Sequence, residues 1–133
     1  MNRSQARELA FKFLYQIEIQ KEVNNEDIAL FFENNSINSK EAQEYIEDII
    51  EGVSKEKEII IEGIQKNLKE DWEIDRISKI NLALLKLAIY EIKIKKLPFK
   101  VVINEVVELA KKYGEENSSV FINGVLASVI KEV

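Results

Sequence analysis

The region from residue 82 to residue 126 constrains the fold of this chain more than any other. It starts with an almost uninterrupted apolar stretch, passes the single proline at position 98, and continues as an amphipathic segment to Gly114. Proline suits the first turn of a helix, and glycine commonly follows the end of one. A last apolar segment opens at Asn117 and Ser118, which are helix-capping residue types. The region therefore predicts three consecutive helices joined by two corners.

The N-terminal half also follows a helical period. Apolar residues recur at steps of three and four over residues 3–20, which predicts an amphipathic helix. A short helix is expected over Asp27–Glu33, and Asn38 or Ser39 can cap the next one. The β-branched run at residues 59–61 could form a strand, but its Lys/Glu-rich flanks favour a helix. We therefore expect an all-α protein.

Three details of the later helices can be predicted. The most apolar helix should open at Asp75 and be packed on several sides, because it has little polar face. Glu91 interrupts it, and Lys95, four residues on, would be its local partner. Asn123 next to Gly124 predicts a close crossing between the last helix and a neighbour.

Size and charge limit the class of protein. A chain of 133 residues fits a single domain, residues 1–133. The polar N-terminus and the lack of a long uncharged apolar stretch argue against a secretory signal or a membrane span, so we expect a cytoplasmic protein. The net charge of −5 is uneven, because the middle of the chain is strongly acidic and both ends are basic. Polyanion binding would require the two basic ends to meet on one face.

Most catalytic chemistry is excluded by composition. The chain has no histidine and no cysteine, so Ser-His-Asp, Cys-His and Glu-x-x-His arrangements are impossible. Its four glycines are too widely spaced for a phosphate-binding loop. Adjacent carboxylates are expected on exposed helix faces and turns. We therefore expect a non-enzymatic protein without a metal or a cofactor.

Two surfaces are candidates for binding. Arg3, Arg7, Phe11 and Tyr15 recur every four residues along one side of the first helix. Arginine can pair with phosphate, and exposed rings can stack on unpaired bases; alternatively, the rings pack against a neighbouring helix. The second surface is the corner from Lys111 to Phe121, where free amides at a helix start favour an anion. There too, Phe121 could instead belong to the core.

Several separated motifs point to a family. They are AR-LAF-FLYQ from Ala6, W-ID-I from Trp72, and LAIYEI, LPFKVVINEVVELAKKYG and SSVFINGVL further on. In this order the motifs resemble the NusB family of bacterial transcription antitermination factors, over essentially the whole chain. The resemblance implies an all-α fold of two small helical bundles packed together.

The resemblance also implies a function. Members of that family bind single-stranded boxA RNA together with NusE, a small-subunit ribosomal protein, and help to load an antitermination complex on RNA polymerase during ribosomal RNA transcription. By position the resemblance implies NusE contacts at Arg76 and Asn81. It implies RNA contacts at Arg3, Arg7, Tyr15, Asn117, Ser118 and Phe121, and the corner adds Lys111 to these candidate RNA-binding residues.

Two departures from the family pattern bear on affinity. This chain has only Arg3 and Arg7 where some members carry a run of arginines, and it has Asn117 where an acidic residue is common. Weak binding of RNA alone, strengthened by a partner, is therefore expected. Arg7 and Phe121 should share one patch, and Arg7→Glu should weaken RNA binding with little change in thermal stability.

Two other functions remain open at this point. Some ribosomal RNA cytosine methyltransferases carry a NusB-like RNA-binding domain before the catalytic one. A helical bundle that serves only protein association is the other alternative. The family includes monomers and dimers, so a homodimer is possible.

Overall fold

The computed structural model describes residues 1–133, and its regular elements are all helical. In chain order they are α1 (Arg3–Gln20), α2 (Asn25–Asn34), α3 (Lys40–Lys55), α4 (Lys57–Gln65), the 3-10 turn η1 (Ile74–Arg76), α5 (Lys79–Ile89), the π turn η2 (Tyr90–Ile94), α6 (Phe99–Tyr113) and α7 (Ser118–Ile130). No helix combines the length and the apolar character that crossing a bilayer requires.

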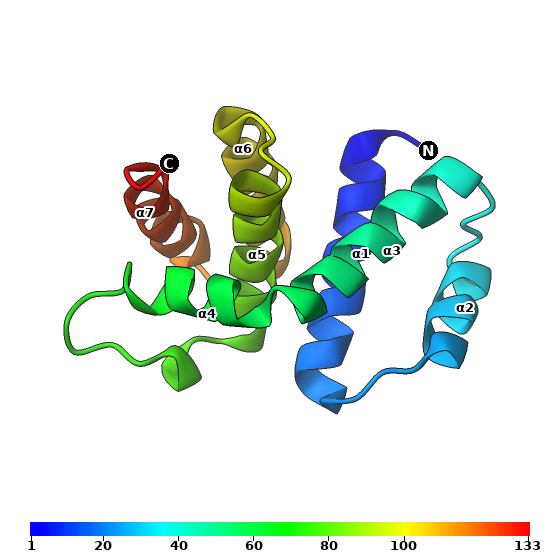
Figure 1. The fold of residues 1–133 in the computed structure, drawn as a ribbon, viewed down its shortest axis with the longest axis horizontal. Helices are drawn as coiled ribbons and strands as arrows, with labels where there is room; N and C mark the ends of the chain where they lie inside the picture. The colour runs from blue at the N-terminus through cyan, green and yellow to red at the C-terminus, as the bar shows by residue number, and fades with distance from the viewer.

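The helices form two bundles that lie side by side (Figure 1). Helices α1, α2 and α3 make up one bundle, and α4 to α7 make up the other. Helices α3 and α4 follow each other almost without a break and run across both bundles. Helix α1 packs on α3 and also on α5, and α5 packs on α4, α6 and α7. The expected all-α fold of two bundles is confirmed.

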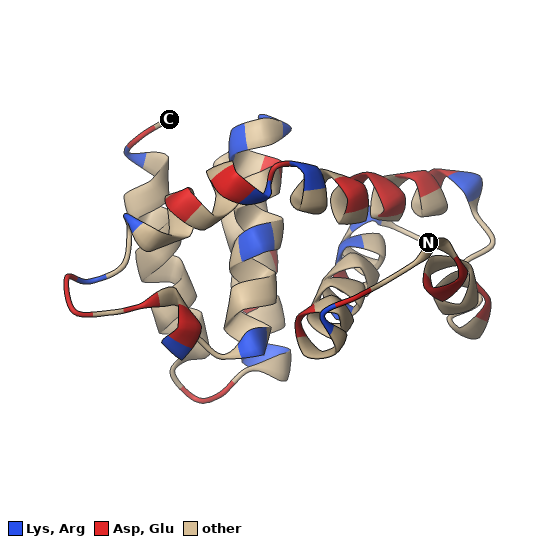
Figure 2. Ribbon diagram, turned by 60° about the horizontal axis from the view of Figure 1, so that its bottom comes forward, with Lys and Arg blue, Asp and Glu red and all other residues tan.

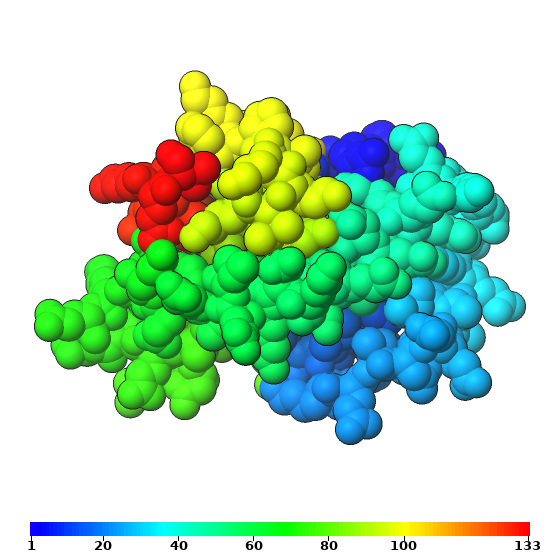
Figure 3. Space-filling view, in the orientation of Figure 1, coloured from blue at the N-terminus to red at the C-terminus, as the bar shows by residue number.

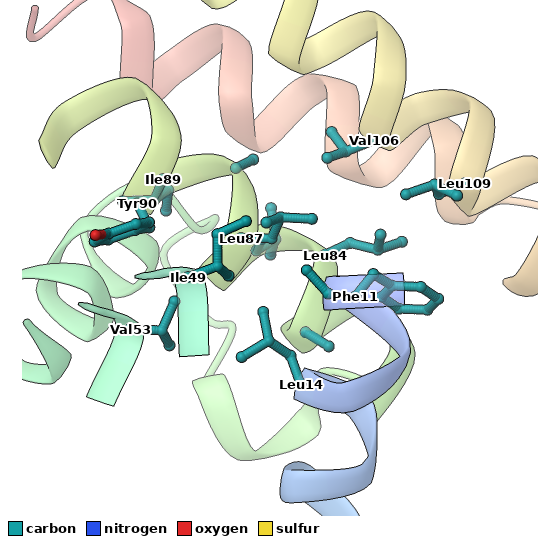
Figure 4. Close-up of a cluster of buried hydrophobic side chains, with 14 of the residues drawn as sticks. Phe11, Leu14, Ile49, Val53, Leu84, Leu87, Ile89, Tyr90, Val106 and Leu109 are labelled. Carbon is teal, nitrogen blue, oxygen red and sulfur yellow. The ribbon is translucent and has the colours of Figure 1, made fainter. Parts of the chain in front are cut away.

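One apolar cluster runs through both bundles (Figure 4). Helix α1 contributes Phe11 and Leu14, and α3 contributes Ile49. These side chains lie in the same cluster as Leu84 of α5 and Val106 of α6. As predicted, α5 is buried on nearly all sides. The bundles therefore share a core, which fixes α1 against α5.

Helix starts follow local capping chemistry. The Ser39 hydroxyl accepts a hydrogen bond from the Ala42 amide at 3.3 Å, which confirms one of the two expected caps. The most apolar helix does not open at Asp75, because Asp75 lies in η1 and Ile77 after it is extended. Ser78 caps α5 instead, accepting from the Asn81 amide at 3.2 Å. Residues 59–61 are helical, within α4.

Two predicted contacts are wrong. Glu91 does not pair with Lys95, because the Glu91 carboxylate is buried and is already bound by Arg7 and by the Tyr45 hydroxyl. Lys95 Nζ lies 3.3 Å from Asp48 instead. Asn123 and Gly124 do not mark a helix crossing, since both are exposed and a Cβ added to Gly124 would meet nothing within 4 Å.

Candidate nucleic-acid interface

A basic and aromatic patch forms where α1 meets the end of α6. We call Lys12, Tyr15, Lys112 and Tyr113 the α1–α6 patch. The Tyr113 ring packs on Phe11, with ring centroids 5.4 Å apart, and Phe11 in turn stacks near Tyr15 at 6.4 Å. Lys12 Nζ and Lys112 Nζ lie 5.5 and 5.3 Å from the centre of the Tyr113 ring. Two cations thus lie close to one ring, an arrangement suited to phosphate and base contacts.

Glu8 holds the two sides of this patch together. Its carboxylate accepts hydrogen bonds from Lys112 Nζ at 2.7 Å and from the Tyr113 hydroxyl. Burial alone would raise the pKa of Glu8, but these bonds and the charges of Lys112 and Lys12 lower it below its ordinary value. The hydrogen bond and charge of Glu8 raise the pKa of Lys112 in return. The patch is therefore tied across α1 and α6 by a charged contact.

An open groove of about 460 Å³ continues from the patch along the start of α1 and the outer side of α6. Lys111 and Lys112 line it on the α6 side, together with Glu105 and Glu108. Lys111 is exposed, and its Nζ lies 3.4 Å from Glu108. Lys111 thus adds a third accessible cation beside the patch.

The two arginines of α1 lie apart from the patch. Arg3 is half-exposed, with its guanidinium carbon 4.0 Å from the centre of the Tyr45 ring and a nitrogen 3.6 Å from Glu41. Arg7 is interior, with only 4% of its side chain exposed. Its Nε and Nη2 donate to Glu91 at 2.7 and 3.2 Å. The expectation that Arg7 lies on the surface is wrong, because this buried carboxylate holds it.

The turn before α7 is built by Ser118. Its hydroxyl is buried and accepts a hydrogen bond from the Glu115 amide at 2.9 Å. Gly114 stops α6 with an extended backbone, and a Cβ there would lie 2.5 Å from Ser118 Oγ. Ser118 therefore shapes the corner from the inside. Asn117, just before it, is exposed and makes no side-chain capping bond.

Phe121 lines a separate cavity, away from the α1–α6 patch. It is half-buried, and its ring centroid lies 5.8 Å from that of Trp72, in the connection between α4 and α5. Together with Asn117 and Val120, these rings line a cavity of about 440 Å³. Phe121 and Arg7 therefore do not share one continuous patch. The first is beside Trp72, and the second is enclosed between α1, α3 and α6.

Comparison with known proteins identifies the family. A model of the NusB family matches residues 4–131. The chain belongs to the NusB family. The transcription antitermination protein NusB of Ruminiclostridium cellulolyticum is 46% identical over 98% of this chain and 90% of its own length. That of Clostridium acetobutylicum is 46% identical over 98% of this chain and 96% of its own length.

A solved NusB structure adds a functional context. A crystal structure of the antitermination factors NusB and NusE in complex with double-stranded RNA contains a chain 30% identical to this one. The TM-score is 0.88, and the match covers all of both chains. The NusB fold that we expected from sequence is thus confirmed by both kinds of comparison.

The two residues implied as NusE contacts lie close in sequence at the start of α5. Arg76 is exposed at the end of η1. Asn81 is in the first turn of α5, and its Oδ1 is buried without a hydrogen-bond partner. Their role as NusE contacts stays a prediction.

Lys12 was not among the sequence-derived candidates, and Lys112 and Tyr113 lay within the candidate corner from Lys111 to Phe121 without being named as RNA-binding residues. Lys12 lies four residues after Glu8 on the side of α1 that faces α6, away from the arginine stripe. That spacing was visible in the sequence. The contact of Glu8 with Lys112 and Tyr113 joins residues more than a hundred positions apart, and no local pattern reveals it.

Proposed function

We propose that this chain is a non-enzymatic transcription antitermination factor that binds single-stranded boxA-type RNA together with NusE. In this role it acts in the cytoplasm and helps to load an antitermination complex on RNA polymerase during ribosomal RNA transcription. The α1–α6 patch carries the proposal, because it offers exposed cations beside two tyrosine rings. Phosphates are held by such cations, and unpaired bases stack on such rings.

The proposed RNA contacts follow from exposure. They are the α1–α6 patch, Lys111, Asn117, Phe121 and, at the far end of α1, Arg3. Arg7 and Ser118 support these residues from the interior and do not touch RNA. Arg76 and Asn81 are the proposed NusE contacts. A NusB chain of the same fold occurs in a complex with NusE and RNA, which supports both partners.

The test is a titration of labelled RNA at two salt concentrations, with and without NusE. Four RNAs are compared: a boxA single strand, its scrambled sequence, its duplex, and an unrelated duplex. We expect the boxA single strand to bind more tightly than the scrambled one, and more tightly still when NusE is present. Equal affinity for the boxA and scrambled strands in the presence of NusE would refute the proposal.

The same titration separates the alternatives. Preference for either duplex over the single strand would assign the patch to double-stranded RNA. Absence of RNA binding under all conditions, beside a stable homodimer in sedimentation, would favour a protein that serves only association.

A further inference from the structure

Two buried ion pairs connect α1 to the central helix. Arg7 pairs with Glu91 of η2, and their side chains are 4% and 1% exposed. Glu18 pairs with Lys86 of α5 through two bonds of 2.8 and 3.0 Å, and their side chains are 10% and 16% exposed. Each of the other ion pairs that join helices includes a side chain at least 23% exposed. Both buried pairs therefore lie in the contact between the two bundles.

The signs of these charges alternate along each partner. Helix α1 carries a cation at Arg7 and a carboxylate at Glu18. The opposing segment carries a cation at Lys86 and a carboxylate at Glu91. Arg7, the earlier of the two charges on α1, contacts Glu91, the later one on the opposing segment, and Glu18 contacts Lys86. The two segments therefore run in opposite directions, as Figure 1 shows. Any arrangement that brought Arg7 to Lys86, or Glu18 to Glu91, would bury like charges.

Apolar side chains surround both ion pairs in the contact of α1 with α5. The surrounding core residues of α1 and α5 are mostly Leu, Ile, Phe and Ala, and such side chains carry no charge or hydrogen-bonding group that would require one particular partner. A slip of one helical turn moves a side chain by about 5.4 Å. In the space-filling view the residues near 90–100 fill the space between α3 and the C-terminal end (Figure 3). A slip of this size would bring like charges toward one another, so the charges add an electrostatic cost to the loss of apolar packing.

The pair of Arg7 and Glu91 also contacts two further helices, α3 and α6. The Tyr45 hydroxyl of α3 donates to Glu91 Oε2 at 2.9 Å, and Arg7 Nη1 lies 3.4 Å from Glu105 of α6. The π turn η2 places Glu91 in this interior position. Glu91 is thus held by α1 and α3 while it belongs to the other bundle.

We propose that Arg7, Glu91, Glu18 and Lys86 are positioning residues whose alternating charges fix the register of α1 on α5, and thereby align the α1 side of the RNA-binding patch with its α6 side. Lys12 and Tyr15 belong to one bundle, whereas Lys112 and Tyr113 belong to the other. Their distances hold only in one register. The consequence for RNA rests on the proposed function, but the register itself does not.

The test exchanges one pair and keeps the number of pairs constant. In Glu18→Lys/Lys86→Glu, α1 carries two cations and the α5 side carries two carboxylates, so every register is attractive. Because the chain has no cysteine, spin labels at Gln20→Cys and Asn123→Cys, both exposed, report the distance between bundles. We expect a narrow distance distribution in the parent and a broader or shifted one in the exchange variant.

RNA affinity is measured on the same proteins without labels. If the competent register falls to about a tenth of the population, boxA affinity falls about tenfold. The matched control is Lys95→Met/Asp48→Asn, which removes a half-exposed pair between the bundles and keeps an oxygen for the Tyr90 hydroxyl. The control should leave both readouts unchanged.

A parent-like narrow distribution in the folded exchange variant would overturn the proposal. If that variant does not fold, Arg7→Met/Glu91→Leu takes its place, and the same distribution decides. If the parent fails to bind RNA, the proposed function fails, while the distance measurement still tests the register. A broad distribution with unchanged RNA affinity would overturn the link between the register and RNA binding.

Discussion

Arg7 shows how burial changes the meaning of a charged residue. Burial alone would lower the pKa of its guanidinium, but the hydrogen bond and charge of Glu91 raise it above its ordinary value. The guanidinium is therefore charged, enclosed and hydrogen-bonded. Arg7→Glu would place a carboxylate against Glu91 and Glu105, and we expect the free energy of unfolding to fall by about 3–5 kcal/mol. Urea denaturation followed by circular dichroism measures it.

Arg3→Glu is the control for this prediction. Arg3 lies on the same helix, but about half of its side chain is exposed, and its partner Glu41 is almost fully exposed. Exposed pairs contribute at most about 1 kcal/mol. Equal stabilities for the two variants would mean that the Arg7–Glu91 pair does not stabilise the fold, and would return Arg7 to the surface role that its sequence position suggested.

Glu8 makes the α1–α6 contact sensitive to acid. Because the folded state lowers the pKa of this carboxylate, its contribution to stability is complete above the unfolded pKa, near 4.5. That contribution is lost as the pH falls through the lower folded value. We expect Glu8→Gln to have a melting temperature that depends less on pH than the parent between pH 5 and pH 3. An equal change of melting temperature with pH in the variant and the parent would contradict this prediction.

The sequence predicted which residues share one side of a helix better than it predicted what those residues contact. The stripe of Arg3, Arg7, Phe11 and Tyr15 exists, but Phe11 and Arg7 on it are buried and only Arg3 is exposed. Periodicity gives the side of a helix on which a residue lies. It does not say whether that side meets solvent, since Glu91 is 84 positions away from Arg7 in sequence.

At the scale of elements, two glycines near α7 should respond oppositely to alanine. A Cβ on Gly114 would lie 2.5 Å from Ser118 Oγ and 2.8 Å from the Ala110 carbonyl oxygen. We expect Gly114→Ala to destabilise the protein by about 1–3 kcal/mol through overpacking. Gly124 lies inside α7 with open space around it, so Gly124→Ala should stabilise by about 0.5–1 kcal/mol through helix propensity.

Thermal melts of the two alanine variants test this pair of expectations. Similar melting temperatures would show that the turn before α7 can relax around a methyl group. In that case, lack of room for a side chain would not be the reason why this position needs glycine. The left-handed conformation common at helix ends is not the reason either, because the backbone of Gly114 is extended.

Helix limits were predictable where capping and periodicity agree. The first helix has the predicted limits, residues 3–20, and Ser39 is a cap as expected. The start of α5 was predicted at the wrong residue although Ser78 offered a local cap. The π turn η2 was not predictable, because it depends on how Glu91 and its apolar neighbours fit between α1, α3 and α6, which is a property of packing and not of local sequence.

For the whole molecule, the distribution of charge sets the strength of polyanion binding. Acidic residues follow one another along α3, whereas the basic residues are scattered over the fold (Figure 2). Lys12 and Lys112 are brought together in the α1–α6 patch. With a net charge of −5, the chain as a whole repels RNA, so the affinity must come from local contacts. Binding by this chain alone is therefore expected to be weak and strongly dependent on its few accessible cations.

Salt titrations give the number of phosphates that these cations contact. Each phosphate contact on a single strand contributes about −0.7 to the slope of log affinity against log salt concentration. If Lys12, Lys111 and Lys112 each contact one phosphate, the slope should be about −2. Lys12→Ala/Lys112→Ala should reduce its magnitude by about 1.4 and weaken binding of boxA and scrambled strands alike.

Lys57→Ala is the matched control, because Lys57 is an exposed cation at the start of α4, outside the patch. It should leave the slope unchanged. The two patch lysines are contacted by Glu8 or by the Tyr113 ring, so circular dichroism at each salt concentration must confirm that the double variant stays folded. A slope that responds equally to Lys57→Ala and to the double variant would mean that RNA is attracted by overall charge and not held at the junction of α1 and α6.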